Sequence, residues 1–342
     1  MFGAPLYNSA DTLPEALESL LSQTEARLAV VLVDDGSSDA TPEVAASYAA
    51  LDERITYRRN ERRLGLVGNW RRTLEIATEL FPEVPYFAWA SDHDVWHPRW
   101  LATVTAELDR SPEVVLAFTA NERIDASGDV LHLRHRAAYD SRRHDDAGRR
   151  LRAACRELVA GDAVYGLARV PALRRAGPFR HVLEPDRLLV RSLAVHGHVV
   201  EVPETLWYRR IVSPYSRGRQ RAAFFMDGTP LHAPLPAPLV HAGLFAWDLG
   251  VRGVARPAVP RRQALVLAGT YLWHATAHAL EPPPGKSLTK RRRRARKRVD
   301  RRRDQLRRAR RSTAKRIRRP VRRARRLGGG LANRLRAAGP GL

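Results

Sequence analysis

Three short apolar runs that lack polar alternation constrain the fold of this chain most. They are residues 28–33 (LAVVLV), 85–90 (PYFAWA) and 114–119 (VVLAFT). Strands that are buried on both faces of a sheet have this pattern, whereas half-exposed strands alternate apolar and polar residues. The runs therefore predict parallel strands inside a sheet that is covered by helices.

Helical periodicity separates these runs. A first helix is expected to begin at Asp11 or Thr12, which are good capping residues. Its apolar face consists of Leu13, Leu17, Leu20 and Leu21. A second helix is expected to open at Thr41 and Pro42, and its apolar stripe consists of Val44, Tyr48 and Leu51. Strand and helix alternate, which predicts an α/β fold with a doubly wound, mostly parallel sheet.

Polar clusters follow the predicted strands, where ligands bind in sheets of this kind. The clusters are Tyr7-Asn8, residues 34–37 (DDGS) and residues 91–94 (SDHD). Asp92 and Asp94 form a DxD arrangement that can hold a hard divalent cation. The alternative interpretation of both acidic clusters is a solvated turn, for which Asp-Gly-Ser is suitable chemistry.

The formal charge of +24 is confined to the end of the chain. Residues 285–342 hold 26 of the 60 Lys and Arg residues but only two acids, Asp300 and Asp304. Like-charge repulsion predicts that this tail is disordered or partly helical until it meets an anionic surface. We favour an anionic membrane surface over nucleic acid because the tail has no aromatic residue for base stacking. The alternative is a tail that only aids solubility.

Ordered segments of the N-terminal part resemble glycosyltransferase family 2, whose members have the GT-A fold. The segments are 4–24 (APLYNSADTLPEALESLLSQT), 30–41 (VVLVDDGSSDAT), 61–70 (ERRLGLVGNW), 86–101 (YFAWASDHDVWHPRWL) and 113–131 (EVVLAFTANERIDASGDVL). The resemblance covers residues 1–131 and extends more thinly to about residue 210. It implies an enzyme that transfers a sugar from a nucleoside-diphosphate sugar to a hydroxyl acceptor with inversion.

The resemblance also assigns site residues. The sugar nucleotide would be bound by Pro5, Tyr7, Asn8, Asp34, Asp35, Gly65, Asn69 and Asp92. Within this set Asp35 lies at the nucleotide base, and Asp92 serves both the ribose and the metal. Asp94 would hold the divalent cation, Mn²⁺ or Mg²⁺. His93 stands where many relatives carry an acid, and we interpret it as a spacer.

A catalytic base is expected after the sheet. The resemblance places Asp186 of the segment LEPDRLL at this position, with Glu184 as the second choice. A base opposite the diphosphate implies a single displacement without a covalent intermediate. In the alternative interpretation the two acids cap a helix that carries Leu188, Leu189 and Leu193.

Three parts are expected along the chain. Residues 1–215 form a GT-A-like catalytic domain with a mixed C-terminal part, 216–280 a helical extension packed on it, and 281–342 a Pro-rich linker and polybasic tail. We expect a cytoplasmic enzyme, peripheral on the inner face of the cell membrane, that acts on glycan or lipid-linked acceptors in cell-surface polysaccharide or glycolipid synthesis. The alternative function is an inactive GT-A scaffold that binds an anionic surface or nucleic acid through its tail.

Overall fold

The computed structural model describes residues 1–132, 138–177, 179–211, 224–225, 235–251 and 260–280. The predicted linker and tail, residues 281–342, lie outside these ranges. All described residues belong to one compact unit, Met1–Leu280. The boundaries predicted at residues 215 and 280 stay predictions.

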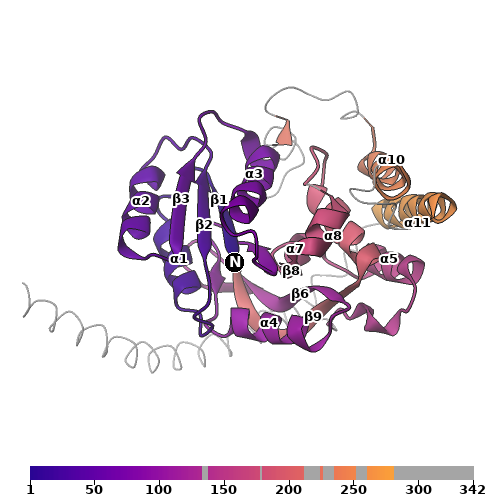
Figure 1. The fold of residues 1–342 in the computed structure, drawn as a ribbon, viewed down its shortest axis with the longest axis horizontal. Coiled ribbons are helices and arrows are strands. Elements are labelled where there is room, and N and C mark those ends of the chain that lie inside the picture. The colour runs from indigo at the N-terminus through magenta and orange to yellow at the C-terminus, as the bar shows by residue number, and fades with distance from the viewer. Residues whose placement is uncertain (133–137, 178, 212–223, 226–234, 252–259, 281–342) are drawn as a thin grey trace, which may run out of the picture. The chain divides into compact units, whose positions relative to one another are not determined.

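One mostly parallel sheet forms the centre of this unit (Figure 1). Its strands are β1 (Phe2–Leu6), β2 (Val30–Asp34), β3 (Ile55–Arg59), β4 (Tyr86–Trp89), β5 (Val95–Trp96), β6 (Val114–Ile124), β7 (Val130–His132), β8 (Leu167–Arg169) and β9 (His198–Arg210). Their order is β3-β2-β1-β4-β8-β6-β9-β5, with β7 paired to β6. Parallel pairs join β1 to β2 and β4, β2 to β3, and β6 to β9. The predicted α/β fold is confirmed.

The run at 114–119 forms part of β6, which lies in the sheet as predicted. It does not pair directly with the earlier strands, as it would in a simple doubly wound sheet. The short strand β8 is inserted between β4 and β6 and runs antiparallel to both. Its three residues are too few to produce a periodic sequence signal. The C-terminal part of the sheet is therefore mixed, as predicted.

Both faces of the sheet are buried, as the apolar runs predict. Val31, Val33 and Phe87 belong to the core on one face, and their neighbours Val30 and Leu32 belong to the core on the other. Successive strand residues point to opposite faces, so a strand of this kind needs apolar residues at every position. Each fully buried side chain of this size contributes about 1.5–3 kcal/mol of hydrophobic stabilisation.

Helices cover both faces of the sheet. They are α1 (Leu13–Leu21), α2 (Thr41–Leu51), α3 (Gly65–Leu80), α4 (Trp100–Arg110), α5 (Ala147–Arg156), α6 (Ala160–Ala163), α7 (Val170–Ala176), α8 (Pro185–His196), α10 (Ala237–Gly250) and α11 (Arg261–Leu280), with a 3₁₀ turn at Ser141–Arg143. The predicted helix after Thr12 is confirmed as α1. For α2 the helix is confirmed, and Val44 and Tyr48 of the predicted apolar stripe pack against the core, but Leu51 does not. Thr41 and Ala45, in its first two turns, are the buried residues, whereas Leu51 at its end is 85% exposed.

A second layer of helices, α10 and α11, packs against α5 and α8. One buried polar chain crosses this layer. Nη1 of Arg191 on α8 donates to the hydroxyl of Tyr271 on α11 (2.9 Å), and that hydroxyl lies 2.6 Å from Nδ1 of His241 on α10. Nε2 of His241 donates to the carbonyl of Leu183 (2.7 Å). Among the described helices, none combines the length and the apolarity needed to cross a bilayer.

Candidate functional site

A pocket of about 270 Å³ lies at the carboxyl ends of β1, β2 and β4. Its lining residues are Pro5, Leu6, Tyr7, Asp35, Arg63, Leu66, Asn69, Trp70, Ser91, Asp92, His93 and Tyr165. The structure thus brings together five of the residues predicted to bind the sugar nucleotide, namely Pro5, Tyr7, Asp35, Asn69 and Asp92. This convergence follows from the parallel pairing of the strands, whose ends meet at one edge of the sheet.

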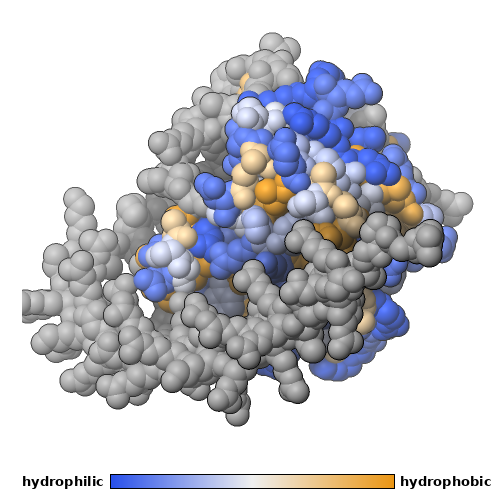
Figure 2. Space-filling model, turned by 90° about the vertical axis from the view of Figure 1, so that its left-hand side faces the viewer, coloured by the Kyte–Doolittle hydropathy of each residue, from blue (hydrophilic) through white to orange (hydrophobic). Residues whose placement is uncertain are grey.

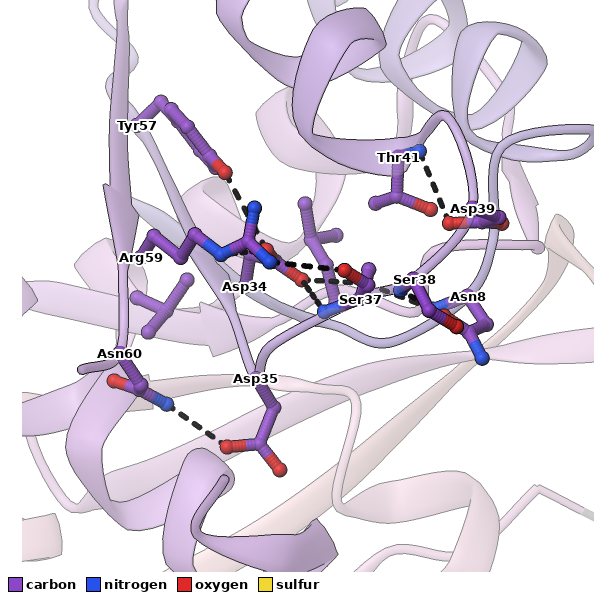
Figure 3. A network of polar contacts seen from close by, with 12 residues as sticks. Asn8, Asp34, Asp35, Ser37, Ser38, Asp39, Thr41, Tyr57, Arg59 and Asn60 are labelled. Atoms are coloured by element: carbon purple, nitrogen blue, oxygen red, sulfur yellow. Dashed lines mark hydrogen bonds and ion pairs between the residues drawn. The ribbon is translucent and has the colours of Figure 1, made fainter. Parts of the chain in front are cut away.

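Asp34 and Asp35 point in opposite directions (Figure 3). The Asp34 side chain is fully buried and accepts hydrogen bonds from the backbone N–H (3.0 Å) and hydroxyl (2.5 Å) of Ser37. Its other oxygen lies 3.4 Å from Nε of Arg59 and from the hydroxyl of Tyr57. The structure therefore does not bring Asp34 into the pocket, because both of its oxygens tie the β2–α2 loop to β3.

Asp35 lines the pocket, and hydrogen bonds from the start of α3 hold its side chain. Its Oδ1 accepts hydrogen bonds from the N–H of Leu64 (2.7 Å) and from the side chain of Asn60 (3.0 Å), and the N–H of Gly65 bonds the same carboxylate. Burial raises the pKa of Asp35, and these hydrogen bonds oppose the rise. Gly65 has a φ of +70°, which glycine adopts without strain. Gly65 thus acts on the pocket by holding Asp35.

Asn69 and Asn8 make hydrogen bonds that fix the segments around the pocket. The side-chain amide of Asn69 donates to the carbonyl of Val33 (2.9 Å), and its oxygen accepts from Asn60 (3.0 Å). Asn69 therefore joins α3 to the end of β2. Asn8 has a φ of +49°, and its side-chain oxygen accepts from the N–H of Ser38 (2.9 Å). Asn8 fixes the loop after β1 and does not line the pocket.

Aromatic side chains form one wall of the pocket. The guanidinium of Arg63 lies 3.8 Å from the centre of the Tyr7 ring, within the range of a cation–π contact. Trp70 stacks on Trp89 and on Phe179, with ring centres 5.4 and 5.0 Å apart. A flat, partly exposed aromatic surface of this kind suits a nucleobase or the apolar face of a sugar ring.

The DxD turn encloses His93. Nδ1 of His93 lies 2.7 Å from Oδ1 of Asp92, and Nε2 lies 3.9 Å from Oδ1 of Asp94. Burial lowers the pKa of His93, but the hydrogen bond to Asp92 and the charges of both aspartates outweigh burial, so the net shift is upward. His93 lines the pocket between the two carboxylates, and its interpretation as a spacer that does not bind the metal stays a prediction.

Asp94 lies behind this histidine and is only 1% exposed. Burial raises the pKa of Asp94 to about 6, although the charge of His93 and the N–H of Arg210 oppose the rise. Its Oδ1 accepts a hydrogen bond from that N–H at 2.7 Å. The negative charge of Asp94 is thus incompletely compensated, and a bound cation would offset it.

The donor set at this turn fits a hard divalent cation. Asp92 and Asp94 offer carboxylate oxygens, the ligands that Mg²⁺ and Mn²⁺ prefer. No group of three His, Cys, Asp or Glu side chains gathers as a ligand set among the residues that the structure describes. Two carboxylates would leave the other coordination positions to phosphate oxygens and water, an arrangement common for Mg²⁺ at phosphate sites.

Arg210, at the end of β9, joins the DxD turn to the loop that contains residues 125–126 and to α1. Its Nε donates to the carbonyl of His93 (2.8 Å), and Nη1 donates to the carbonyls of Asp125 (3.0 Å) and Ala126 (2.8 Å). Its Nη2 pairs with Glu15 on α1 at 2.5 Å. The side chain is 2% exposed, so these contacts exclude water and fix the turn.

The two predicted base candidates lie at the start of α8, in different environments. Asp186 is half-buried, and a side chain at Gly161 would lie 3.3 Å from its Oδ2 and 3.8 Å from Arg209. Burial raises the pKa of Asp186, and the charge of Arg187 opposes the rise. Glu184 has a φ of +53°, makes no side-chain cap, and pairs instead with Arg187 at 3.0 Å.

Tyr165 also lines the pocket. Burial raises the pKa of its hydroxyl, the charge of Arg209 opposes the rise, and the charges of Asp94, Asp92 and Asp186 add to it. Sequence reasoning missed Tyr165, Arg63 and Arg209. Arg63 lies in the segment 61–70, and Arg209 lies in the thinner part of the resemblance that extends to about residue 210, so proximity to a motif was the available signal.

The fold matches that of a solved structure and can be assigned to a fold class. The structure superposes on that of residues 1–349 of S. aureus TarS in complex with UDP-GlcNAc, with a TM-score of 0.55 and 13% identity, over 81% of this chain and 72% of that one. The curled, mainly parallel sheet is that of the GT-A glycosyltransferases.

Residues 3–163 match the family model described as Glycosyl transferase family 2. This segment is thus a glycosyltransferase family 2 segment, and together with the fold it supports a glycosyltransferase enzyme. An uncharacterized glycosyltransferase of Rickettsia prowazekii is 29% identical over 131 residues, which are 37% of this chain and 38% of that relative. An uncharacterized glycosyltransferase of Haemophilus influenzae is 27% identical over 127 residues, 37% of this chain and 35% of that relative. The chain thus matches little more than a third of the length of these relatives.

Proposed function

We propose that this protein transfers a sugar from a nucleoside-diphosphate sugar to a hydroxyl acceptor by a single displacement with inversion. The observation that carries the proposal is the pocket itself. Asp35 and Asp92 line it from two different strand ends, and Asp94 lies directly behind His93. A site with aromatic walls and converging carboxylates suits a ligand that combines a base, two hydroxyl-rich rings and a metal-bound diphosphate.

The donor is expected to lie along the pocket with its base near Asp35 and Tyr7. The ring of Tyr7 and the guanidinium of Arg63 offer a stacking surface, and the Asp35 carboxylate can accept hydrogen bonds from base N–H groups. Asp92, which lines the same pocket, is expected to accept hydrogen bonds from the ribose hydroxyls. The resemblance to TarS, which was crystallised with UDP-GlcNAc, makes UDP-sugars the first donors to examine.

Asp94 and Asp92 would hold a divalent cation, Mn²⁺ or Mg²⁺. When bound, such a cation neutralises the charge that develops on the leaving diphosphate. The chain's own contribution is to keep the two carboxylates in place, which Arg210 does through Asp94 and the carbonyl of His93.

Asp186 is the proposed base. It would accept the proton of the acceptor hydroxyl as that oxygen attacks the anomeric carbon, while the bond from that carbon to the diphosphate breaks. The upward pKa shift of Asp186 brings its basicity closer to that required near neutral pH. Glu184 is the second choice, and its ion pair with Arg187 lowers its availability.

The biological setting is also part of the proposal. We expect a glycan or lipid-linked acceptor in cell-surface polysaccharide or glycolipid synthesis. Residues 285–342, which carry 26 Lys and Arg residues, would attract the enzyme to the anionic inner face of the cell membrane. Liposome flotation of the full chain and of a chain that ends at Pro284 tests this role of the tail. Equal flotation of both would exclude it.

A panel of UDP-, GDP- and dTDP-sugars tests the proposed activity. The full chain is incubated with each donor and Mg²⁺ or Mn²⁺, and both binding and hydrolysis are measured. We expect one nucleotide to be bound, EDTA to abolish turnover, and Asp94→Asn to reduce it at least about 100-fold. Failure to bind any sugar nucleotide with either metal would exclude the proposal and favour an inactive scaffold.

A further inference from the structure

The outer faces of α10 and α11 are apolar where a surface helix is normally polar. Seven of the twelve exposed large apolar side chains among the described residues lie in this short part of the chain. They are Leu235, Leu239, Trp247, Val251, Leu265, Val266 and Trp273, with exposures between 46% and 72%. Single exposed apolar residues are ordinary, but a concentration of this size marks an interaction surface.

Helical spacing places these side chains on continuous stripes. On α11 the exposed residues Leu265, Gly269, Trp273 and Ala277 recur at steps of four, and Val266 adjoins this stripe. Arg261, Arg262 and Gln263 are exposed at the start of the helix. Ala264, Leu267, Ala268 and Tyr271 on the opposite side are buried against α5 and α10. Apolar residues therefore surround α11, although only one side of it is covered by the rest of the described structure.

A cationic recess adjoins this face. It has a volume of about 470 Å³ and is lined by Arg152, Arg156, Gly269, Thr270, Trp273 and His274. Arg152 and Arg156 are one helical turn apart on α5, and neither has a carboxylate partner among the residues described. Burial lowers the pKa of His274, and the charges of Arg152 and Arg156 lower it further.

The charge around the recess has one sign. Helices α5 and α11 contain six arginines and no acidic residue. The acids that flank α5 are already engaged, since Asp146 pairs with Arg149 and Glu157 pairs with Arg143. The sequence that follows Leu280 adds a further 26 Lys and Arg residues between 285 and 342.

We propose that the outer face of α11 and the α5–α11 recess together dock on an anionic phospholipid bilayer. Trp273, Leu265 and Val266 would enter the boundary between headgroups and acyl chains, where tryptophan is enriched in membrane proteins. A lipid phosphate would bind between Arg152 and Arg156, and Arg262 would remain at headgroup level. This surface lies in the folded unit and is distinct from the tail of residues 285–342.

The opposite side of the molecule provides the contrast. Figure 2 shows the side on which α2 lies in Figure 1, and its described residues are largely hydrophilic with apolar residues in small groups. Leu51, the last residue of α2, is 85% exposed. In Figure 1, α10 and α11 lie at the outer margin, away from β1–β3. The apolar and cationic surface is therefore a local feature.

Vesicle flotation of the full chain tests this surface. The variants are a face variant (Leu265→Ser, Val266→Ser, Trp273→Ser) and a recess variant (Arg152→Gln, Arg156→Gln). The matched controls are Leu51→Ser and the charge-matched pair Arg27→Gln with Arg72→Gln, both of exposed residues. Vesicles consist of phosphatidylcholine alone or with one quarter phosphatidylglycerol.

We expect the parent chain and both controls to float with anionic vesicles, and the face and recess variants to lose about tenfold in partition coefficient. Circular dichroism confirms that each variant is folded, and donor hydrolysis in solution should stay unchanged, which separates this proposal from the proposed activity. Equal flotation of all variants would assign binding to the tail alone and overturn the proposal. Unchanged flotation with an altered oligomeric state in the face variant would show a protein interface and also overturn it.

Discussion

The backbone N–H of Arg210 donates a 2.7 Å hydrogen bond to the buried carboxylate of Asp94, although 116 residues separate the two in sequence. The end of β9 thereby defines where the DxD turn lies. The side chain of Arg210 reinforces this contact through the carbonyl of His93. The proposed metal-binding turn thus depends on a strand that lies beyond the residues matched by the family model, 3–163.

Arg210→Met should weaken both stability and donor binding. It leaves the carbonyls of His93, Asp125 and Ala126 without their donor, which we expect to lower the free energy of unfolding by about 3 kcal/mol. In the folded fraction the KM for the sugar nucleotide should rise about tenfold. Urea unfolding and steady-state kinetics measure the two effects. Arg99→Met, which breaks an exposed pair with Glu204, is the control and should cost less than about 1 kcal/mol. Equal effects of both substitutions would contradict a special role for Arg210.

The adjacent residues Asp34 and Asp35 should respond differently to the same substitution. Asp34→Asn removes the charge that Ser37, Tyr57 and Arg59 surround, so it should lower stability by about 2 kcal/mol and leave the KM for the donor near its parent value. Asp35→Asn alters the pocket and should raise that KM about tenfold with a smaller effect on stability. Thermal unfolding and initial-rate measurements on both variants decide between these assignments. The reverse pattern would show that Asp34 is the donor contact.

The pH dependence of turnover should identify the base. Burial raises the pKa of Asp186, and a base acts only when deprotonated, so kcat/KM should fall as the pH drops through an apparent pKa above the usual range for aspartate. Asp186→Asn should remove this acidic limb and lower kcat at least about 100-fold. Glu184→Gln is the matched control and should retain the limb. If the limb disappears in Glu184→Gln instead, the second choice is the base.

The N-terminal half of the fold could be predicted because its signals are local. Runs such as residues 28–33 are apolar at every position since each strand is buried on both faces, and the polar residues that follow them, such as Asp35, had to meet at one edge of the sheet. The direction in which each side chain points could not be predicted from the sequence. Asp34 and Asp35 have the same chemistry and adjoining positions, and only the packing of Arg59 and Leu64 around them decides which one faces the pocket.

Contacts between distant segments could not be predicted. β8 has three residues and no periodicity, yet it brings Tyr165 of the preceding turn to the pocket. Arg210 reaches Glu15 across 195 residues, and no local pattern encodes that pair. Leu51 of the predicted α2 stripe is exposed for a related reason, because the part of a helix that meets the sheet depends on tertiary packing.

The buried His241 should make the helical layer of α8, α10 and α11 sensitive to acid. Its Nδ1 faces the Tyr271 hydroxyl, its Nε2 donates to Leu183, and burial lowers its pKa to about 4. A histidine in the unfolded chain has a pKa of about 6.5, so between pH 6.5 and 4 the unfolded chain binds more protons than the folded protein. The contribution of His241 to the free energy of unfolding is therefore complete above about pH 6.5 and is lost as the pH falls toward 4. Between pH 7.5 and 5 the free energy of unfolding should drop by about 2 kcal/mol from this residue.

His241→Gln should flatten that dependence, and urea unfolding at several pH values between 5 and 7.5 measures it. Burial also lowers the pKa of His196 on α8 to about 4, so His196→Gln should remove a second contribution of the same sign. The double variant should show the sum of the two changes, because His241 packs on Tyr271 whereas charges of Arg175 and Arg150 act on His196. A parent-like slope in His241→Gln would mean that His241 is protonated in the folded protein at pH 5, or that the layer opens before the histidine titrates.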